Sequence, residues 1–354
     1  AIKTARDMAR DQRPGLTEPE MVLPVTAHPA FEKGAHYFGV KPVHIPVRED
    51  FRADVEAAKA AITDKTVLIV GSALCYPYGT IDPIPELAAL AQERGIGCHV
   101  DACVGGFLLP FLPRLGYTVP AWDFSVPGVT SISADLHKYG YAARGSSTVV
   151  YRSKEIRRYQ FFTYADWPGG LYGSPTMAGS RPGGAIAAAW AVLNYLGEDG
   201  YLRLARTVMD TARKLIDGIN AIDGLRVIGE PDASIFSFTA DDVDIYAVAD
   251  AMDTRGWQLD RQQMPPKLHL VVTPAHEKIV GTFLADLEWA TQSVATEGPT
   301  PGGRAAMYGM MGSLPDRGAV EKVIMDFMDR ATESKQEDPM AGLPGRTDGG
   351  SVKS

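Results

Sequence analysis

Apolar runs in the first half of the chain are separated by segments whose apolar positions recur with helical spacing. Residues 66–73 are apolar almost throughout, which is typical of a strand covered on both faces in a parallel sheet. The segment 84–94 carries one apolar helical stripe and is followed by Gly95, a frequent helix terminator. Shorter strands are predicted at 97–102 and 131–135. This order predicts a layered α/β fold with its chemistry at the carboxyl ends of the strands.

The second half of the chain has the clearest amphipathic pattern, at 199–222, which predicts a helix connecting two domains. Beyond it the pattern reads as strand, helix, strand and helix. We therefore predict a large domain over 1–198, a connecting helix over 199–222 and a smaller C-terminal α/β domain over 223–335. The remainder, 336–354, is rich in glycine, proline and charge and is predicted to be disordered.

Composition narrows the possible classes of protein. Of 354 residues, 45% are hydrophobic and 22% charged, as in soluble globular proteins. The 35 basic and 43 acidic side chains leave a net charge of -8, which argues against a nucleic-acid partner. No apolar stretch approaches the ~20 residues that cross a bilayer, so no membrane span is predicted. Cys75, Cys98 and Cys103 lack metal-ligand spacing, which predicts no metal site and indicates a reducing compartment.

Two polar residues at strand ends carry the strongest chemical signal. Lys138 follows the predicted strand 131–135, where a lysine can bind an aldehyde cofactor covalently; a solvated loop lysine is the alternative. Asp101 ends another apolar strand, where a buried carboxylate needs a cation such as the protonated ring nitrogen of pyridoxal phosphate. An aspartate that only caps a loop is the alternative for this position.

Five stretches extend this signal over most of the first 190 residues. Through them the sequence resembles pyridoxal phosphate enzymes of aspartate aminotransferase fold (fold type I) and, among these, the sphingosine-1-phosphate lyases. The resemblance implies a large domain with a mainly parallel sheet and a smaller C-terminal α/β domain. The stretches are TAHPAFEKGAHYFG, GSALCYPYGTIDPI, HVDACVGGF, SISADLHKYGYAARGSS and GSPTMAGSRPGG.

The resemblance also implies roles for particular residues. Lys138 carries the cofactor pyridoxal 5'-phosphate, Asp101 holds its pyridine nitrogen, and His28 stacks on its ring. His137 is implied as a ligand of the cofactor phosphate, and Ser180 as a second one, supplied by the neighbouring subunit of a homodimer. From the residues alone, His28 could equally be a surface histidine, and Ser180 part of a tight turn.

Two further residues concern the substrate, and one family motif is missing. Tyr76 is expected to reach the substrate C3 hydroxyl or phosphate, unless it is an interfacial tyrosine without a catalytic duty. Arg144 stands where the family is expected to have a lysine; the charge is kept, but the donor geometry differs. The family's Thr-Ser-Gly-Gly-Thr phosphate loop is absent from this sequence, and residues 1–10 resemble the helix that follows it. We therefore expect the chain to begin inside the large domain, in a cytoplasmic protein whose membrane anchor, if any, lies upstream.

The implied activity is cleavage of sphingosine 1-phosphate, or a related phosphorylated sphingoid base, between C2 and C3. The products are a long-chain aldehyde and phosphoethanolamine. The base that acts on the C3 hydroxyl stays open among the Lys138 amine, Tyr76 and a cofactor phosphate oxygen. An amino acid decarboxylase that shares Lys138, Asp101 and His28 is the first alternative, and a non-catalytic homologue acting as a scaffold is the second.

Overall fold

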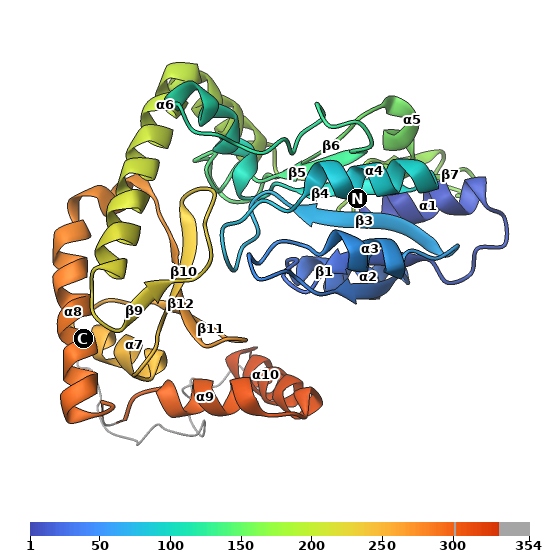
Figure 1. Ribbon diagram of the computed structural model, residues 1–354. Helices are drawn as coiled ribbons and strands as arrows, with labels where there is room; N and C mark the ends of the chain where they lie inside the picture. Colours follow the sequence, from blue (N-terminus) through green and yellow to red (C-terminus); the bar gives the residue numbers. More distant parts are fainter. Residues whose placement is uncertain (301, 333–354) are drawn as a thin grey trace. The chain divides into compact units, whose positions relative to one another are not determined.

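A computed structural model describes residues 1–300 and 302–332 (Figure 1). The chain divides into two compact units, which we call unit 1 and unit 2. Unit 1 contains residues 1–210 and 229–235, and unit 2 contains 211–228 and the chain from residue 236. The domain boundaries expected at 198, 222 and 335 stay predictions, and the predicted disordered segment 336–354 lies outside the described residues.

Unit 1 is built on a six-stranded sheet in which every neighbouring pair of strands is parallel except the last, β5 and β6. This confirms the predicted α/β class with a mainly parallel sheet. Strands β1 and β3 are buried at every position, which explains why their apolar runs do not alternate with polar residues. The spatial order is β2 (Lys41–Ile45), β1 (Glu20–Pro24), β3 (Thr66–Ser72), β4 (Gly97–Asp101), β5 (Ser131–Ala134) and β6 (Thr148–Tyr151).

Helices cover both faces of this sheet. Leu68 and Val70 of β3 join one apolar cluster with helices α1 and α2. Gly71 of the same strand instead faces Ile84 and Leu87 of α4, which contacts α3 on that side. The helices are α1 (Ile2–Gln12), α2 (Ala30–Phe38), α3 (Val55–Ala61), α4 (Ile84–Arg94), α5 (Lys154–Arg157) and α6 (Gly183–Asn220), with 3-10 turns η1 (Gly105–Phe107), η2 (Leu109–Phe111), η3 (Pro113–Leu115) and η4 (Arg158–Gln160).

Helix α4 matches its predicted range because both of its signals are local. Its buried residues fall on one stripe, and its C-cap Gly95 adopts a left-handed conformation with φ 64°. Helix α6 differs from its prediction at 199–222: it begins at Gly183, ends at Asn220 and is interrupted at Gly197 (φ 55°, ψ -174°). The pattern found only its second part, because the first part leaves large apolar side chains in solvent.

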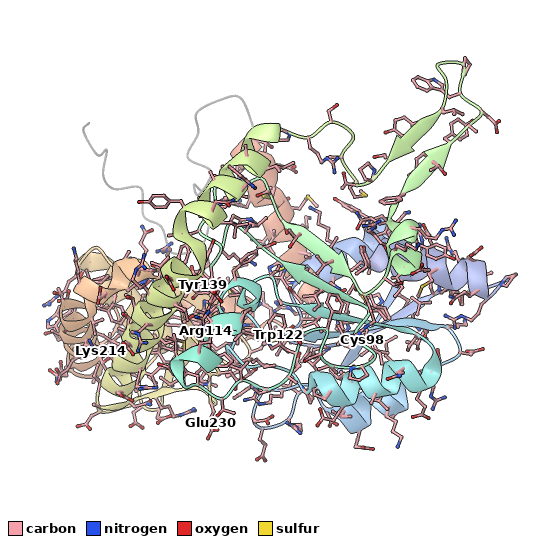
Figure 2. All side chains as sticks on the ribbon, turned by 90° about the horizontal axis from the view of Figure 1, so that it is seen from above. Cys98, Arg114, Trp122, Tyr139, Lys214 and Glu230 are labelled. Carbon is pink, nitrogen blue, oxygen red and sulfur yellow. The ribbon has the colours of Figure 1, made fainter. Side chains whose placement is uncertain are left out.

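Unit 1 also contains a two-stranded hairpin, β7 (Phe162–Tyr164) and β8 (Tyr172–Ser174), separate from the main sheet. In Figure 2 this hairpin projects away from the sheet. Its side chains are almost all exposed.

Unit 2 is a smaller α/β unit, as predicted, around a four-stranded sheet with the order β11-β12-β10-β9. The buried carboxylate of Asp250 links two helices and a strand of this unit: it accepts hydrogen bonds from Arg261 Nη2 and from the Ala305 backbone N–H, both at 2.7 Å. The elements are β9 (Leu225–Val227), β10 (Ile235–Ala240), α7 (Ile245–Thr254), β11 (Asp260–Gln262), β12 (Lys267–Val271), η5 (Pro274–Lys278), α8 (Val280–Glu297), α9 (Ala305–Ser313) and α10 (Arg317–Thr332). Across residues 1–300 and 302–332, helices long and apolar enough to span a membrane are absent.

Candidate functional site

A cavity of about 410 Å³ opens in unit 1 where β3, β4 and β5 end, beside the start of α2. This is the edge of a parallel sheet at which ligands bind in open α/β folds. Four of the residues selected from the sequence line it together: His28, Tyr76, Asp101 and Lys138. Cys103, Ser133 and Asp135 line it as well.

Lys138 lies in the turn after β5, with its side chain partly exposed to the cavity. Its Nζ is 3.0 Å from Asp135 Oδ2, and Asp135 also accepts a hydrogen bond from the Ser147 hydroxyl. Burial raises the pKa of Asp135, but the hydrogen bonds from Ser147 and Lys138 outweigh it and keep that pKa below its usual value. Asp135 therefore holds the Lys138 amine as an ionised partner.

Asp101 ends strand β4 and points its carboxylate into the same cavity. Its Oδ1 accepts a hydrogen bond from the Cys103 backbone N–H at 3.0 Å and one from the Ser133 hydroxyl at 3.3 Å. Strands β4 and β5 are neighbours with Asp101 opposite Ser133, so the carboxylate and the lysine turn emerge side by side. Ser133 was not among the residues selected from the sequence, where its only signal was its place on the strand before Lys138.

His28 and Tyr76 line the cavity from two loops, one that precedes α2 and one that follows β3. His28 Nδ1 accepts a hydrogen bond from the Ala30 backbone N–H at 3.1 Å, which fixes the ring at the start of α2. The rings of His28 and Tyr76 meet edge to face, with centroids 6.4 Å apart and an interplanar angle of 87°. A flat imidazole and a phenol therefore lie next to each other in the cavity lining.

The loop that carries Tyr76 is held by residues 229–235, which we call the 229–235 strap. Asp232 Oδ2 accepts hydrogen bonds from the Ile81 backbone N–H and from Arg52 Nη1, both at 2.6 Å. Arg52 also donates to the Ile81 carbonyl at 2.6 Å. The strap and the loop are thus joined through the ion pair of Asp232 and Arg52, which has little exposure to water.

The 229–235 strap contacts the lysine turn as well. A Cβ at Gly79, which has φ +70°, would lie 1.8 Å from the Ile235 carbonyl oxygen, so the Tyr76 loop approaches the strap as closely as glycine permits. Ser234 donates a hydrogen bond to the Tyr139 hydroxyl at 2.6 Å, and Tyr139 directly follows Lys138. Figure 2 labels Tyr139. The strap therefore positions both loops that carry candidate residues.

A second buried carboxylate, Asp82, lies behind the cavity. It accepts hydrogen bonds from the backbone N–H groups of Ala53 (2.8 Å) and Ser72 (2.7 Å). Its complete burial raises its pKa to about 6, against the smaller opposing effect of those two bonds. Ser72 lines the cavity, so Asp82 fixes one of its walls.

Three of the selected residues do not line this cavity. His137 Nδ1 lies 3.2 Å from the Ser146 carbonyl oxygen, and its Nε2 lies 3.7 Å from Asp135 Oδ2. Arg144 and Ser180 are exposed to solvent. Within one chain, the structure therefore gathers the residues expected at the aldehyde, pyridine and ring face of the cofactor, but not those expected at its phosphate.

The cavity has the donors and acceptors that pyridoxal phosphate requires at its reactive end. Lys138 has an amine for the aldehyde, Asp101 a carboxylate for the ring nitrogen and His28 a flat ring for one face of the cofactor. All three line one cavity. The residues present fit this cofactor. Among residues 1–300 and 302–332, three or more His, Cys, Asp and Glu side chains are nowhere grouped so that they could hold a metal ion.

Large apolar side chains are exposed at many positions from the hairpin to the first part of α6. Leu171 and Tyr195 are each 89% exposed. We call this the 161–195 surface, and Ser180 lies within its range. Its large side chains are Phe161, Phe162, Tyr164, Trp167, Leu171, Tyr172, Met177, Ile186, Trp190 and Tyr195.

Comparison with known proteins places these features in a family. Residues 3–241 match the model of the pyridoxal-dependent decarboxylase conserved domain. The chain is 48% identical over 330 residues to the sphingosine-1-phosphate lyase of Arabidopsis thaliana, covering 93% of this chain and 60% of that protein. It is 43% identical to sphingosine-1-phosphate lyase 1 of Rattus norvegicus, covering 93% of this chain and 58% of the relative. The chain thus spans about three fifths of the curated relatives that it matches.

Solved structures agree with this placement. The sphingosine-1-phosphate lyase of Burkholderia pseudomallei matches with a TM-score of 0.85 and 40% identity, covering 95% of this chain and 72% of that one. Glutamate decarboxylase of Lactobacillus brevis, at 23% identity and a TM-score of 0.73, shares the fold. The chain therefore belongs to the pyridoxal-dependent decarboxylase family and, within it, to the sphingosine-1-phosphate lyases.

Proposed function

We propose that this chain is the catalytic part of a pyridoxal phosphate-dependent lyase that cleaves sphingosine 1-phosphate or a related phosphorylated sphingoid base between C2 and C3. The observation that carries the proposal is the meeting of Lys138 and Asp101 in one cavity with His28 and Tyr76. Membership of the lyase family supports the choice of substrate.

The proposed reaction conserves all atoms of the substrate. The C3 hydroxyl loses its proton, the C2–C3 bond breaks, C3 becomes the aldehyde carbon and C2 gains a proton to give phosphoethanolamine. When bound, pyridoxal phosphate supplies a conjugated ring that accepts the electron pair of the broken bond. The protein orients the bond and moves the protons.

Each cavity residue has a separate task in this proposal. Lys138 provides the attachment amine, which Asp135 keeps in place at 3.0 Å. Asp101 presents its carboxylate to the ring nitrogen, and His28 covers a ring face. Tyr76 contacts the substrate at its C3 hydroxyl or phosphate, while the base stays open among the Lys138 amine, Tyr76 and a cofactor phosphate oxygen.

We also propose a cytoplasmic homodimer with shared active sites. The 161–195 surface supports this, because large apolar side chains so exposed are typical of protein interfaces. Ser180 is exposed in the same segment of the chain, which leaves it accessible for the proposed contact with the cofactor phosphate of a neighbouring subunit. His137 as the second phosphate ligand and Arg144 as a substrate contact remain part of the proposal.

Product analysis of the full-length protein tests the function. We expect a long-chain aldehyde and phosphoethanolamine in equal amounts from sphingosine 1-phosphate, together with a visible cofactor absorbance band that Lys138→Ala abolishes. Carbon dioxide from an amino acid, without aldehyde from the lipid, would show a decarboxylase instead. Binding of the cofactor with neither reaction would show a non-catalytic homologue.

A further inference from the structure

A row of polar side chains leads from the interior of the sheet to the Asp101 carboxylate. His99 lies on β4, two residues before Asp101 and therefore on the same face of the strand. Ser131 and Ser133 lie opposite His99 and Asp101 on the neighbouring strand β5. The register of two parallel strands thus brings together two pairs of polar groups that lie 32 positions apart in the sequence.

These groups form one continuous chain of hydrogen bonds. His99 Nδ1 is 2.9 Å from Ser131 Oγ, and His99 Nε2 is 3.2 Å from Ser133 Oγ. The Ser133 hydroxyl is in turn 3.3 Å from Asp101 Oδ1. The Cys103 thiol donates to Ser133 Oγ at 3.2 Å.

The charge on Asp101 determines the direction of every proton in this chain. An ionised carboxylate only accepts hydrogen bonds, so the single hydroxyl proton of Ser133 points at Asp101. Ser133 Oγ then has two lone pairs, one for the Cys103 thiol and one for an N–H on His99 Nε2. His99 Nδ1 is left to accept the hydroxyl proton of Ser131.

The surroundings of His99 require a neutral ring, which has a single N–H. The residue is 2% exposed, and its burial lowers its pKa to about 3. The Phe31 ring covers it with centroids 5.8 Å apart. A neutral imidazole with its proton on Nε2 satisfies all contacts, whereas a proton on Nδ1 would turn the Ser133 hydroxyl away from Asp101.

We propose that His99 and Ser133 are positioning residues that hold the Asp101 carboxylate toward the cofactor's ring nitrogen, through a hydrogen-bond chain directed outward from Ser131. This inference rests on the proposed function for the identity of the cofactor. The direction of the hydrogen bonds is a property of the protein alone.

The tautomer of His99 tests the direction of the chain. We would label histidine with ¹⁵N in the full-length protein, measure the nitrogen shifts at neutral pH and assign the His99 signals by their loss in His99→Gln. We expect the Nε2–H tautomer in the unsubstituted protein. The Nδ1–H tautomer or a doubly protonated ring would overturn the proposal.

Cofactor affinity tests the positioning role. Ser133→Ala removes a hydrogen bond to the Asp101 carboxylate. It should therefore weaken the affinity for pyridoxal phosphate by about 10-fold or more. Ser133→Thr, which restores a hydroxyl, should recover most of it, and Ser125→Ala in an exposed loop should change nothing. Equal affinities of Ser133→Ala and the unsubstituted protein would overturn the positioning role of Ser133. If the unsubstituted protein binds no pyridoxal phosphate, the proposed function is rejected, and the tautomer result still stands.

Discussion

The hydrogen-bonded side chains next to Asp101 and the exposed 161–195 surface differ in whether their side chains have partners within the chain. Behind Asp101, each polar group has a partner on the neighbouring strand, from His99 to the cavity. On the 161–195 surface, Leu171 and Tyr195 are almost completely in solvent. The polar groups of the first region are paired within one chain, whereas the second leaves large apolar side chains uncovered, as the proposed homodimer would require. Under the proposed function, the groups that contact the cofactor ring can therefore be altered separately from the surface proposed for dimerisation.

Removing the attachment amine should have the largest effect on the buried region. Lys138→Ala should lower the rate of aldehyde release by about 10³-fold, since Lys138 is the only lysine among the described residues that line the cavity. Initial rates with the full-length protein measure this. Lys214→Ala, an exposed lysine of α6 labelled in Figure 2, is the matched control and should keep full activity. A Lys138→Ala protein with more than a tenth of the original rate would reject this role for the lysine.

The buried carboxylate Asp82 should make stability depend on pH. Its folded pKa of about 6 exceeds the ordinary value of 3.8, so the folded state binds the proton more tightly. The free energy of unfolding should therefore fall as the pH rises from about 4 to 6, by up to about 3 kcal/mol from this group.

Urea unfolding at several pH values checks this prediction. Asp82→Asn cannot ionise, so its stability should decline less over the same interval than that of the unsubstituted protein. Parallel curves for the two proteins would show that Asp82 is not the group responsible.

Weakening the 229–235 strap should have a smaller effect on the same region. Asp232→Asn keeps the shape but removes the charge that faces Arg52, which should lower the free energy of unfolding by about 2 kcal/mol. The KM for the lipid substrate should also rise, because the strap holds the Tyr76 loop. Asp223→Asn, an exposed aspartate, is the control. A stability loss with an unchanged KM would restrict Asp232 to a structural role.

A charge introduced on the 161–195 surface should test the exposed region in the same way. Trp190 is 68% exposed in the single chain, so Trp190→Asp should leave its folding intact and weaken dimerisation by about 10-fold. Analytical ultracentrifugation measures the dissociation constant. Met328→Asp on α10, which also replaces an exposed apolar side chain, should have no such effect. Identical association of both variants would exclude this surface as the interface.

The sequence predicted best those elements whose signals are local. Helix α4 was found at its observed bounds because an amphipathic stripe and Gly95 both lie within one short segment. Strands β1 and β2 went unpredicted, since five residues each carry too little pattern to identify a strand, and β2 is moreover buried only at Ile45. The start of α6 was missed because its first part has no buried stripe to reveal it.

Within the site, the sequence by itself determined which residue types stand at the strand ends, and this was enough to select Lys138 and Asp101. Only the tertiary structure decided which groups meet them. Ser133 and His99 contact each other because β4 and β5 are paired in one particular register, and Asp232 contacts the Tyr76 loop across 151 positions of the sequence. Strand register and long-range chain return depend on the packing of the whole sheet, and no local pattern of residues encodes them.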